Sequence, residues 1–524
     1  MTAVYKIAIM ILLFLGPSVR GAELQITPYS DDVYRALDSA GNNRADLEKV
    51  FSHYAAPEDS LKLKAALYLV GNMGGHSYVT FDLRDSVGQE VPFSIFDYPK
   101  YDSLEAGWKV LEAKYGTLDF KRKETIYDLQ TIRADYLINQ IDYAFRAWRE
   151  KPWAKNLPVD IFFDYVLPYR CSNEPIEPWR EIFWEKYKDI TSKMADSTDP
   201  MEAAGLINND VMTWFTFDPR FYYHPTDQGL SEMMKNHLGR CEDMTNAAIY
   251  AMRANGVAVT SDYTPFWANS GNNHAWNAIV LPDRKVIPFM GAESNPGKYQ
   301  LANKLAKVYR KTYAQQHNNL IFQERKQQKV PGWLAGKSYI DVTSAYTKTC
   351  DIAVTFNKPV PDSVDIAYLC VFNSGEWQAI HWGRIKNGQA VFNSMGTDIA
   401  YLPALYMDEK IVPYGSPFIL NNDCTTREFS PDEERSITAE FVSTTKVAQV
   451  ASTDGIAKSF LTPGKEYELF YWDDGWQSIG KITAGDQPLK FEKIPSAGLY
   501  WLVAKDSDRE ERIFTIDDNQ QVWW

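Results

Sequence analysis

From about residue 336 to the C-terminus, short stretches of alternating apolar residues are separated by Gly, Asn, Asp and Pro every eight to twelve residues. Residues that alternate in polarity form strands with one buried face, and frequent turn residues connect such strands through tight hairpins. The last third of the chain is therefore predicted to be all-β, with a strand spacing that is typical of β-sandwiches.

A weak internal repeat divides this β-rich region into two halves. Gly375-Glu376-Trp377-Gln378 aligns with Asp474-Gly475-Trp476-Gln477, with the Trp and Gln positions offset by 99 residues. The same offset aligns further pairs: Tyr368 and Tyr467, Phe372 and Tyr471, Ile380 and Ile479, Phe392 and Phe491, Tyr401 and Tyr500. A constant offset indicates two copies of one unit, so we expect two sandwiches, at 336–435 and 436–524.

Residues 22–200 have a different pattern, with apolar residues at helical spacing. Runs of this kind start at Asn43 and at Ser60, and a longer one covers residues 126–148. They predict a mainly helical N-terminal region, interrupted by extended segments at 77–81 and 91–96. Residues 201–335 mix both patterns and form a third region. The 167–171 loop, which contains Pro168, is a candidate to line a cleft.

The first 21 residues have the features of a secretory signal. Lys6 precedes a nine-residue apolar run at 7–15, and the small residues Val19 and Gly21 stand where signal peptidase reads, before Ala22. The run is too short for a permanent membrane span. We therefore expect an exported protein, periplasmic or extracellular, with no membrane span after cleavage.

Composition excludes several functions. The chain has a net charge of −13, and its longest basic run is Lys121-Arg122-Lys123, so nucleic acid is not an expected partner. The motifs of zinc peptidases, nucleotide hydrolases and serine esterases are missing from the sequence, and we expect no metal or cofactor. The five cysteines do not form a disulfide scaffold, although one bridge is possible among Cys350, Cys370 and Cys424.

Cys241 has the context of a reactive thiol. It lies in Gly239-Arg240-Cys241-Glu242-Asp243-Met244, directly before an Ala-rich helical run that ends at Asn255-Gly256. The free N–H groups at a helix start favour a thiolate, while the adjacent carboxylates of Glu242 and Asp243 oppose it.

His274 is the candidate partner of this thiol. It begins a predicted strand at 274–281, which a turn at 282–285 connects to a second strand at 286–290. The hairpin brings residues 290–293 opposite His274, and Glu293 is the nearest carboxylate that fits as a third member of a triad. Asp283 lies at the far tip and does not fit.

These segments together resemble the transglutaminase-like superfamily. The motif around Cys241, the Ala-rich helix, Arg253-Ala254-Asn255-Gly256-Val257 and His274-Ala275-Trp276-Asn277 follow its order and spacing over about 205–295. The resemblance implies a papain-like α+β core with Cys241 as nucleophile and His274 as general base and acid. Where the family has its Asp, this chain has Phe289-Met290, so Glu293 serves only if the strand end bends.

The expected architecture is thus α+β: a papain/transglutaminase-like core after a helical region and before two sandwiches. The candidate oxyanion donors are the backbone N–H of Cys241 and the side chains of Gln228, Asn236 and Trp214. The expected function is acyl transfer from a peptide, protein or glycopeptide substrate, with hydrolysis favoured over cross-linking. The alternative is a non-catalytic protein that binds glycan or peptide by stacking on tryptophans of the β region, namely Trp377, Trp382, Trp472, Trp476 and Trp501.

Overall fold

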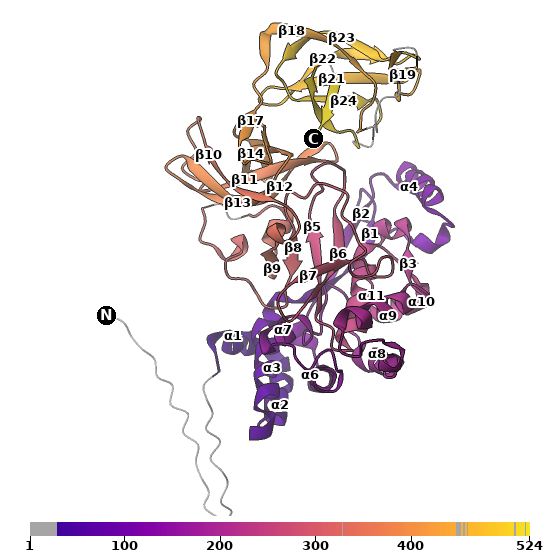
Figure 1. Cartoon of the computed structure of the whole chain (residues 1–524), viewed down its shortest axis with the longest axis vertical. Helices are drawn as coiled ribbons and strands as arrows, with labels where there is room; N and C mark the ends of the chain where they lie inside the picture. The colour runs from indigo at the N-terminus through magenta and orange to yellow at the C-terminus, as the bar shows by residue number, and fades with distance from the viewer. Residues whose placement is uncertain are drawn as a thin grey trace, which may run out of the picture.

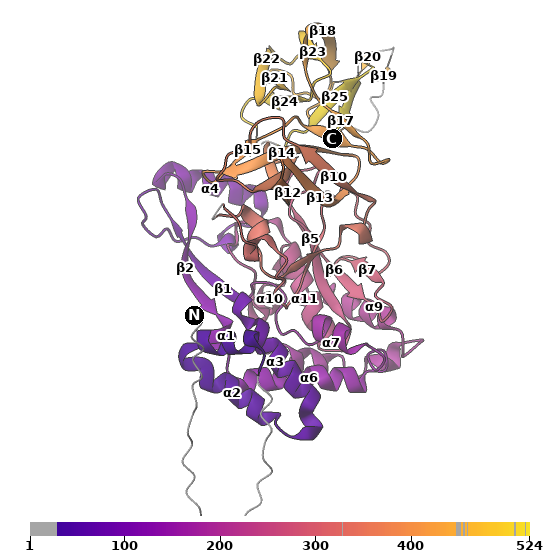
Figure 2. The ribbon, with the colours of Figure 1, turned by 90° about the vertical axis from the view of Figure 1, so that its left-hand side faces the viewer.

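The computed structural model describes residues 29–326, 329–446, 452–453, 456–457, 459–507, 510–518 and 520–524. The expected signal segment, 1–21, lies outside these ranges. The chain is elongated, with the N-terminal helices at one end and the last β domain at the other (Figure 1, Figure 2). Along the described residues, no helix combines the length and apolar character needed to cross a bilayer.

The N-terminal part is helical with one inserted β-hairpin, β1 (Ser77–Arg84) and β2 (Asp119–Tyr127). Its helices are α1 (Asp31–Ser39), α2 (Arg44–His53), α3 (Ser60–Asn72), α4 (Tyr101–Tyr115), α5 (Asp128–Thr131), α6 (Ala134–Glu150), α7 (Val159–Tyr165) and α8 (Arg180–Lys186). One local prediction was wrong: the run at 126–148 is broken, because Ile126 lies in β2 and Ile132 is extended between α5 and α6. In the segment predicted to be extended at 91–96, Ser94 is extended, but a 3₁₀ turn occupies Ile95–Asp97 and the only bridge nearby is at Glu90, among the described residues.

The central part is a five-stranded antiparallel sheet with helix α11 (Cys241–Arg253) packed on it. The strand order is β7 (Val286–Phe289), β6 (His274–Val280), β5 (Val259–Thr264), β8 (Tyr309–Lys311) and β9 (Tyr339–Asp341). Two further helices, α9 (Pro200–Val211) and α10 (Leu230–Asn236), pack beside α11. The strand β9 lies beyond the boundary expected at 335 and completes this sheet.

Helix α11 can lie close to the sheet because its inward face carries small residues. Ala247, Ala248 and Ala251 are fully buried, and a Cβ atom added at Gly291 would come within 2.5 Å of the Met244 carbonyl oxygen. One apolar core runs from the N-terminal helices into this region, joining Val33 on α1 to Met252 on α11. The helical part and the central sheet therefore share a core.

The first β domain has eight strands in the order β10-β13-β12-β11-β14-β16-β17, with β15 paired to β14. They are β10 (Thr349–Thr355), β11 (Ile366–Asn373), β12 (Glu376–Lys386), β13 (Gln389–Gly396), β14 (Ile399–Met407), β15 (Lys410–Pro413), β16 (Phe418–Leu420) and β17 (Thr426–Glu428). A disulfide joins Cys350 on β10 to Cys424 between β16 and β17. It links the two ends of the sheet, so the sheet is curved back on itself.

The second β domain repeats part of the first. Its strands are β18 (Asp432–Phe441), β19 (Ser452–Thr453), β20 (Ile456–Ala457), β21 (Glu466–Trp472), β22 (Trp476–Thr483), β23 (Leu489–Ser496), β24 (Tyr500–Ala504), β25 (Ile513–Asp517) and β26 (Gln520–Trp523). The hairpin β21–β22 and the pair β21–β24 correspond to β11–β12 and β11–β14. The predicted α+β class is thus confirmed, with a helical region, an α+β core and then β domains in chain order.

The repeated tryptophans lie where the two β domains meet. Trp377 of the first domain is 5.6 Å from Trp472 of the second, measured between ring centroids, and Phe372 is 5.7 Å from Trp476. Trp377, Trp472 and Trp501 are buried in this cluster. Much of the aromatic content of this region therefore holds the domains together.

The disulfide gives a testable thiol count. Cys171, Cys241 and Cys370 are free and Cys350 is bridged to Cys424, so titration of the denatured, unreduced protein should find three thiols, and five after reduction. Because the bridge closes a loop across a sequence separation of 74 residues, Cys424→Ser should lower the free energy of unfolding of this domain by about 2–4 kcal/mol. Five thiols before reduction would contradict the assignment.

Candidate active site

The start of α11 is fixed by buried polar contacts, and it places Cys241 as the first helical residue. The Asp243 carboxylate accepts hydrogen bonds from the backbone N–H groups of Arg240 and Gln228, at 3.0 and 2.9 Å. Gly239 is required just before the helix, because an added Cβ would come within 2.6 Å of the Asp243 side chain. Gly239 is also held by β4 (Leu238–Gly239), which pairs with β3 (Thr216–Phe217). The sequence motif is therefore a helix cap, and its contacts fix the position of the Cys241 thiol.

The Cys241 thiol lies beside a carboxylate and a strand end. Its Sγ donates to Glu242 Oε2 at 3.0 Å, and Glu242 is in turn 3.4 Å from Arg240 Nε. Burial, followed by the charge of Glu242, raises the pKa of Cys241 above its ordinary value, while a backbone hydrogen bond with Ala275 acts in the opposite direction. Since Cys241 is only 6% exposed, burial and the carboxylate outweigh the helix start, and the resting group is a thiol.

His274 is the first residue of β6 and directly precedes Ala275. Its ring is half-buried and stacks on Trp267 at a centroid distance of 5.7 Å. Burial lowers the pKa of His274, so the imidazole is neutral at neutral pH. Helix α11 packs against β6, where the Asn277 side chain donates to the Thr245 carbonyl at 3.0 Å, so the two predicted motifs lie on adjoining elements.

The strand that was expected to carry the acid turns away before it reaches His274. The pairing of β6 with β7 ends at Asn277 and Phe289. Met290 and Ser294 then bond each other through their backbones, and Ala292 adopts a φ of 59°. Glu293 is thus exposed on this tight turn. The strand end bends, as the prediction required, but the hydrogen bond of the imidazole goes to another residue.

That residue is Tyr299, which the sequence analysis missed. Its hydroxyl lies 2.7 Å from Nε2 of His274. Burial, then the charge of Glu293, raise the pKa of Tyr299, so the hydroxyl stays protonated. Nδ1 of His274 has no hydrogen-bond partner among the described residues. No local pattern identifies Tyr299, because a half-buried tyrosine in a loop is common.

The candidate oxyanion donors are placed near the helix start, but two of them bond to each other. Gln228 is fully buried, and its Nε2 donates to the Leu238 carbonyl while its Oε1 accepts from Asn236 Nδ2 at 3.1 Å. Trp214 Nε1 is buried without a partner among the described residues. The role of all three as oxyanion donors stays a prediction.

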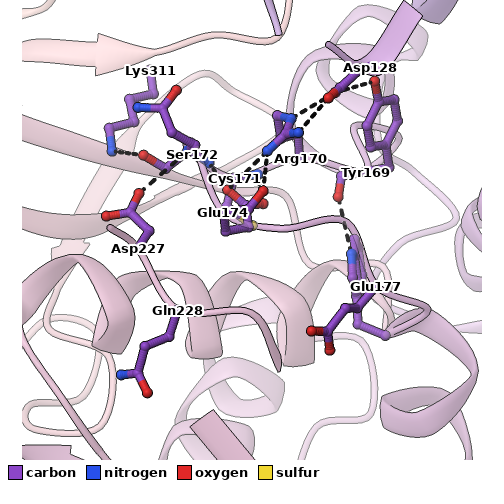
Figure 3. Close-up of polar contacts among 12 residues, drawn as sticks. Asp128, Tyr169, Arg170, Cys171, Ser172, Glu174, Glu177, Asp227, Gln228 and Lys311 are labelled. Atoms are coloured by element: carbon purple, nitrogen blue, oxygen red, sulfur yellow. Dashed lines mark hydrogen bonds and ion pairs between the residues drawn. The ribbon is translucent and has the colours of Figure 1, made fainter. Parts of the chain in front are cut away.

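The 167–171 loop carries a second polar network (Figure 3). Arg170 Nε donates to Asp128 Oδ2 at 2.8 Å, and the Glu174 carboxylate accepts the backbone N–H groups of Cys171 and Ser172. The Cys171 thiol is buried here, and its burial and Glu174 raise its pKa. Among the described residues, no group of three or more His, Cys, Asp or Glu side chains is arranged to hold a metal ion.

The influence of Glu242 on the thiol can be measured directly. In Glu242→Gln the carboxylate charge is lost, so the pKa of Cys241 should fall and iodoacetamide should label it faster at pH 8, by roughly tenfold for each unit of pKa. Labelling should be followed on the peptide that contains Cys241. The exposed Glu185→Gln on α8 is the control, and an equal rate in both variants would contradict this electrostatic account.

One family of known proteins matches the region that contains the candidate site. The model of the transglutaminase-like superfamily matches residues 188–290, which include Cys241 and His274. Among solved structures, the chain is similar to a crystal structure of red sea bream transglutaminase, with 8% identity, a TM-score of 0.21, and coverage of 87% of this chain and 77% of that one. No curated protein matches the chain. Residues 188–290, about a fifth of the chain, are therefore the part that is similar to the transglutaminase-like superfamily.

Proposed function

We propose that the protein is a thiol-dependent acyl-transfer enzyme with Cys241 as nucleophile and His274 as general base and acid. The observation that supports this most is the packing of α11, which begins with Cys241, against β6, which begins with His274. The two side chains start as a neutral pair, which suits a base that must accept a proton.

The proposed reaction follows from these groups. The Cys241 sulfur bonds to the carbonyl carbon of a peptide or carboxamide, and its proton passes to the free Nδ1 of His274. The imidazolium then gives that proton to the departing nitrogen as the C–N bond breaks, which leaves a thioester. Water attacks the thioester and returns a proton to sulfur through His274, releasing the carboxylic acid.

Tyr299 serves in this scheme as a positioning residue. If its oxygen accepts from Nε2–H of His274, the other ring nitrogen is left unprotonated and able to take the thiol proton. Glu293 acts on the tyrosine hydroxyl rather than on the ring, since its charge contributes to the raised pKa of Tyr299.

We further propose that the thioester reacts with water, so that the enzyme hydrolyses a peptide, protein or glycopeptide. Transfer of the acyl group to an amine is the other possible outcome of the same thioester. Tyr222 lies beside the thiol, since burial and Cys241 raise its pKa to about 12, and it is 52% exposed. Solvent water is therefore close to the thioester. Adding a primary amine and measuring acid against amide product separates the two outcomes.

Export is a further part of the proposal. It rests on the signal pattern of residues 1–21 and is supported by the Cys350–Cys424 disulfide, which is a bond typical of oxidising compartments.

A non-catalytic binding function is the second candidate. A cavity of about 640 Å³ lies at the junction of the β domains, lined in part by Trp333, Trp377, Trp472 and Trp476. Trp333 is 39% exposed, so its ring is available for stacking with a glycan or peptide. This function requires no reactive Cys241.

The mechanism predicts distinct losses in two variants. With an activated acyl ester, Cys241→Ala should abolish acyl-enzyme formation, because no sulfur remains to form the thioester. His274→Ala should slow it by roughly 10²- to 10⁴-fold through loss of proton transfer. Intact-mass analysis of quenched reactions measures the thioester. Cys171→Ser, which removes the other buried thiol of the helical and central parts, is the control and should react at the wild-type rate. Full activity of Cys241→Ala would end this proposal and favour the binding function.

Loss of the tyrosine hydroxyl should change the titration of His274. In Tyr299→Phe, Nε2–H loses its acceptor and the imidazolium is less stable, so the acidic limb of the pH–rate profile should move to lower pH. The rate at pH 7 should fall by about tenfold, which corresponds to one hydrogen bond. Tyr222→Phe, also beside Cys241, is the matched control, and an unmoved acidic limb in Tyr299→Phe would exclude the positioning role.

A further inference from the structure

A second cavity, of about 580 Å³, lies between the N-terminal part and the central sheet. Five cationic side chains line it, namely Arg122, Arg170, Arg253, Lys311 and Lys337. Among its described lining residues none is Asp or Glu. The chain as a whole carries a net charge of −13, so this concentration of positive charge is local to the cavity.

Three of the five cations are compensated by neighbouring protein groups, and Figure 3 shows two of them, Arg170 and Lys311. Arg170 pairs with Asp128. Lys311 donates a hydrogen bond to Ser172 Oγ at 2.6 Å. Burial would raise the pKa of Asp227, but the positive charges of Arg240 and Lys311 outweigh burial and lower this pKa to about 2. Arg253 donates hydrogen bonds to backbone carbonyls. The negative charge of buried Glu174 also stabilises the charged guanidinium of Arg253.

The remaining two cations, Arg122 and Lys337, form no ion pair with any described carboxylate. Both are exposed, so they stand where the cavity meets solvent. His76, also in the wall, adds no charge, because burial lowers its pKa to about 4. The hydroxyl oxygen of Ser338 is buried in the wall without a partner among the described residues. The cavity therefore has a positive excess and an unused hydrogen-bonding group.

Aromatic residues complete the wall. Tyr263 and Trp333 lie 5.3 Å apart between ring centroids, and both line the cavity together with Tyr339. Volumes of this size hold a small organic molecule rather than a single ion. Stackable surface beside cations fits a ligand that has both an apolar body and an anionic group.

We propose that this cavity is a binding site for a small organic anion, with a phosphate or carboxylate group held by Arg122 and Lys337 and a flat body against Tyr263 and Trp333. The site is separate from the thiol. Arg253 ends α11 and Cys241 begins it, which places them about 18 Å apart along the helix. The proposal thus stands whether or not Cys241 is catalytic.

Calorimetric titration of the full-length protein at low salt tests this site. The probes are phenyl phosphate and benzoate, which carry the two candidate anions on one ring, and uncharged benzyl alcohol. We expect saturable binding of one or both anions at one site per chain, weakened by added salt. Arg122→Met and Lys337→Met should each weaken it by roughly five- to tenfold. The stronger of the two anionic probes identifies the preferred group.

Lys123→Met is the matched control. Lys123 follows Arg122 on β2, carries the same charge and pairs with Asp82 rather than lining the cavity. It should leave the affinity unchanged, as should Cys241→Ala. The proposal is overturned if neither anion binds saturably, if benzyl alcohol binds as well as the anions, or if Lys123→Met weakens binding as much as Arg122→Met.

Discussion

The packing of α11 against β5 and β6 determines everything that the candidate site can do. Small residues on the helix and Gly291 allow the close approach, and Asn277 on β6 joins the parts by donating to the Thr245 carbonyl and accepting from the Gly291 N–H. Because the helix begins where the strand begins, its first side chain lies beside the first residues of β6. A shift of this helix by one turn, about 5.4 Å, would separate the thiol from the imidazole.

Electrostatics around the thiol differ from those of a preformed ion pair. A helix start favours the thiolate, but burial and the adjacent Glu242 act more strongly and keep Cys241 protonated. Burial also keeps His274 neutral. The thiol and the imidazole are thus both neutral at rest, and in the proposed mechanism proton transfer from sulfur accompanies the attack on the substrate. Arg240 forms an ion pair with Glu242, so each motif residue from Gly239 to Asp243 contributes to the structure or electrostatics of the site.

The sequence indicated most of the central site because its signals are local. The helix start at Cys241, the helix end near Gly256 with a φ of 74°, and the strand from His274 follow from caps, glycines and apolar spacing. The hydrogen-bond partner of the imidazole could not be predicted in this way. It depends on a tight turn at Met290–Ser294 and on the return of the chain to Tyr299, which are tertiary features. The cationic cavity is harder still, because its lining comes from segments between residues 75 and 339 that meet only in the folded chain.

The proposed mechanism requires the side chains of residues 241 and 274 to face each other, and a short bifunctional thiol reagent can detect this arrangement. His274→Cys should be treated at alkaline pH with dibromobimane, which fluoresces when both of its arms have reacted with thiols. We predict a fluorescent product in which one bimane joins the peptides containing Cys241 and residue 274. Separate, single labelling of the two cysteines, with no joined peptide, would show that the two side chains do not face each other.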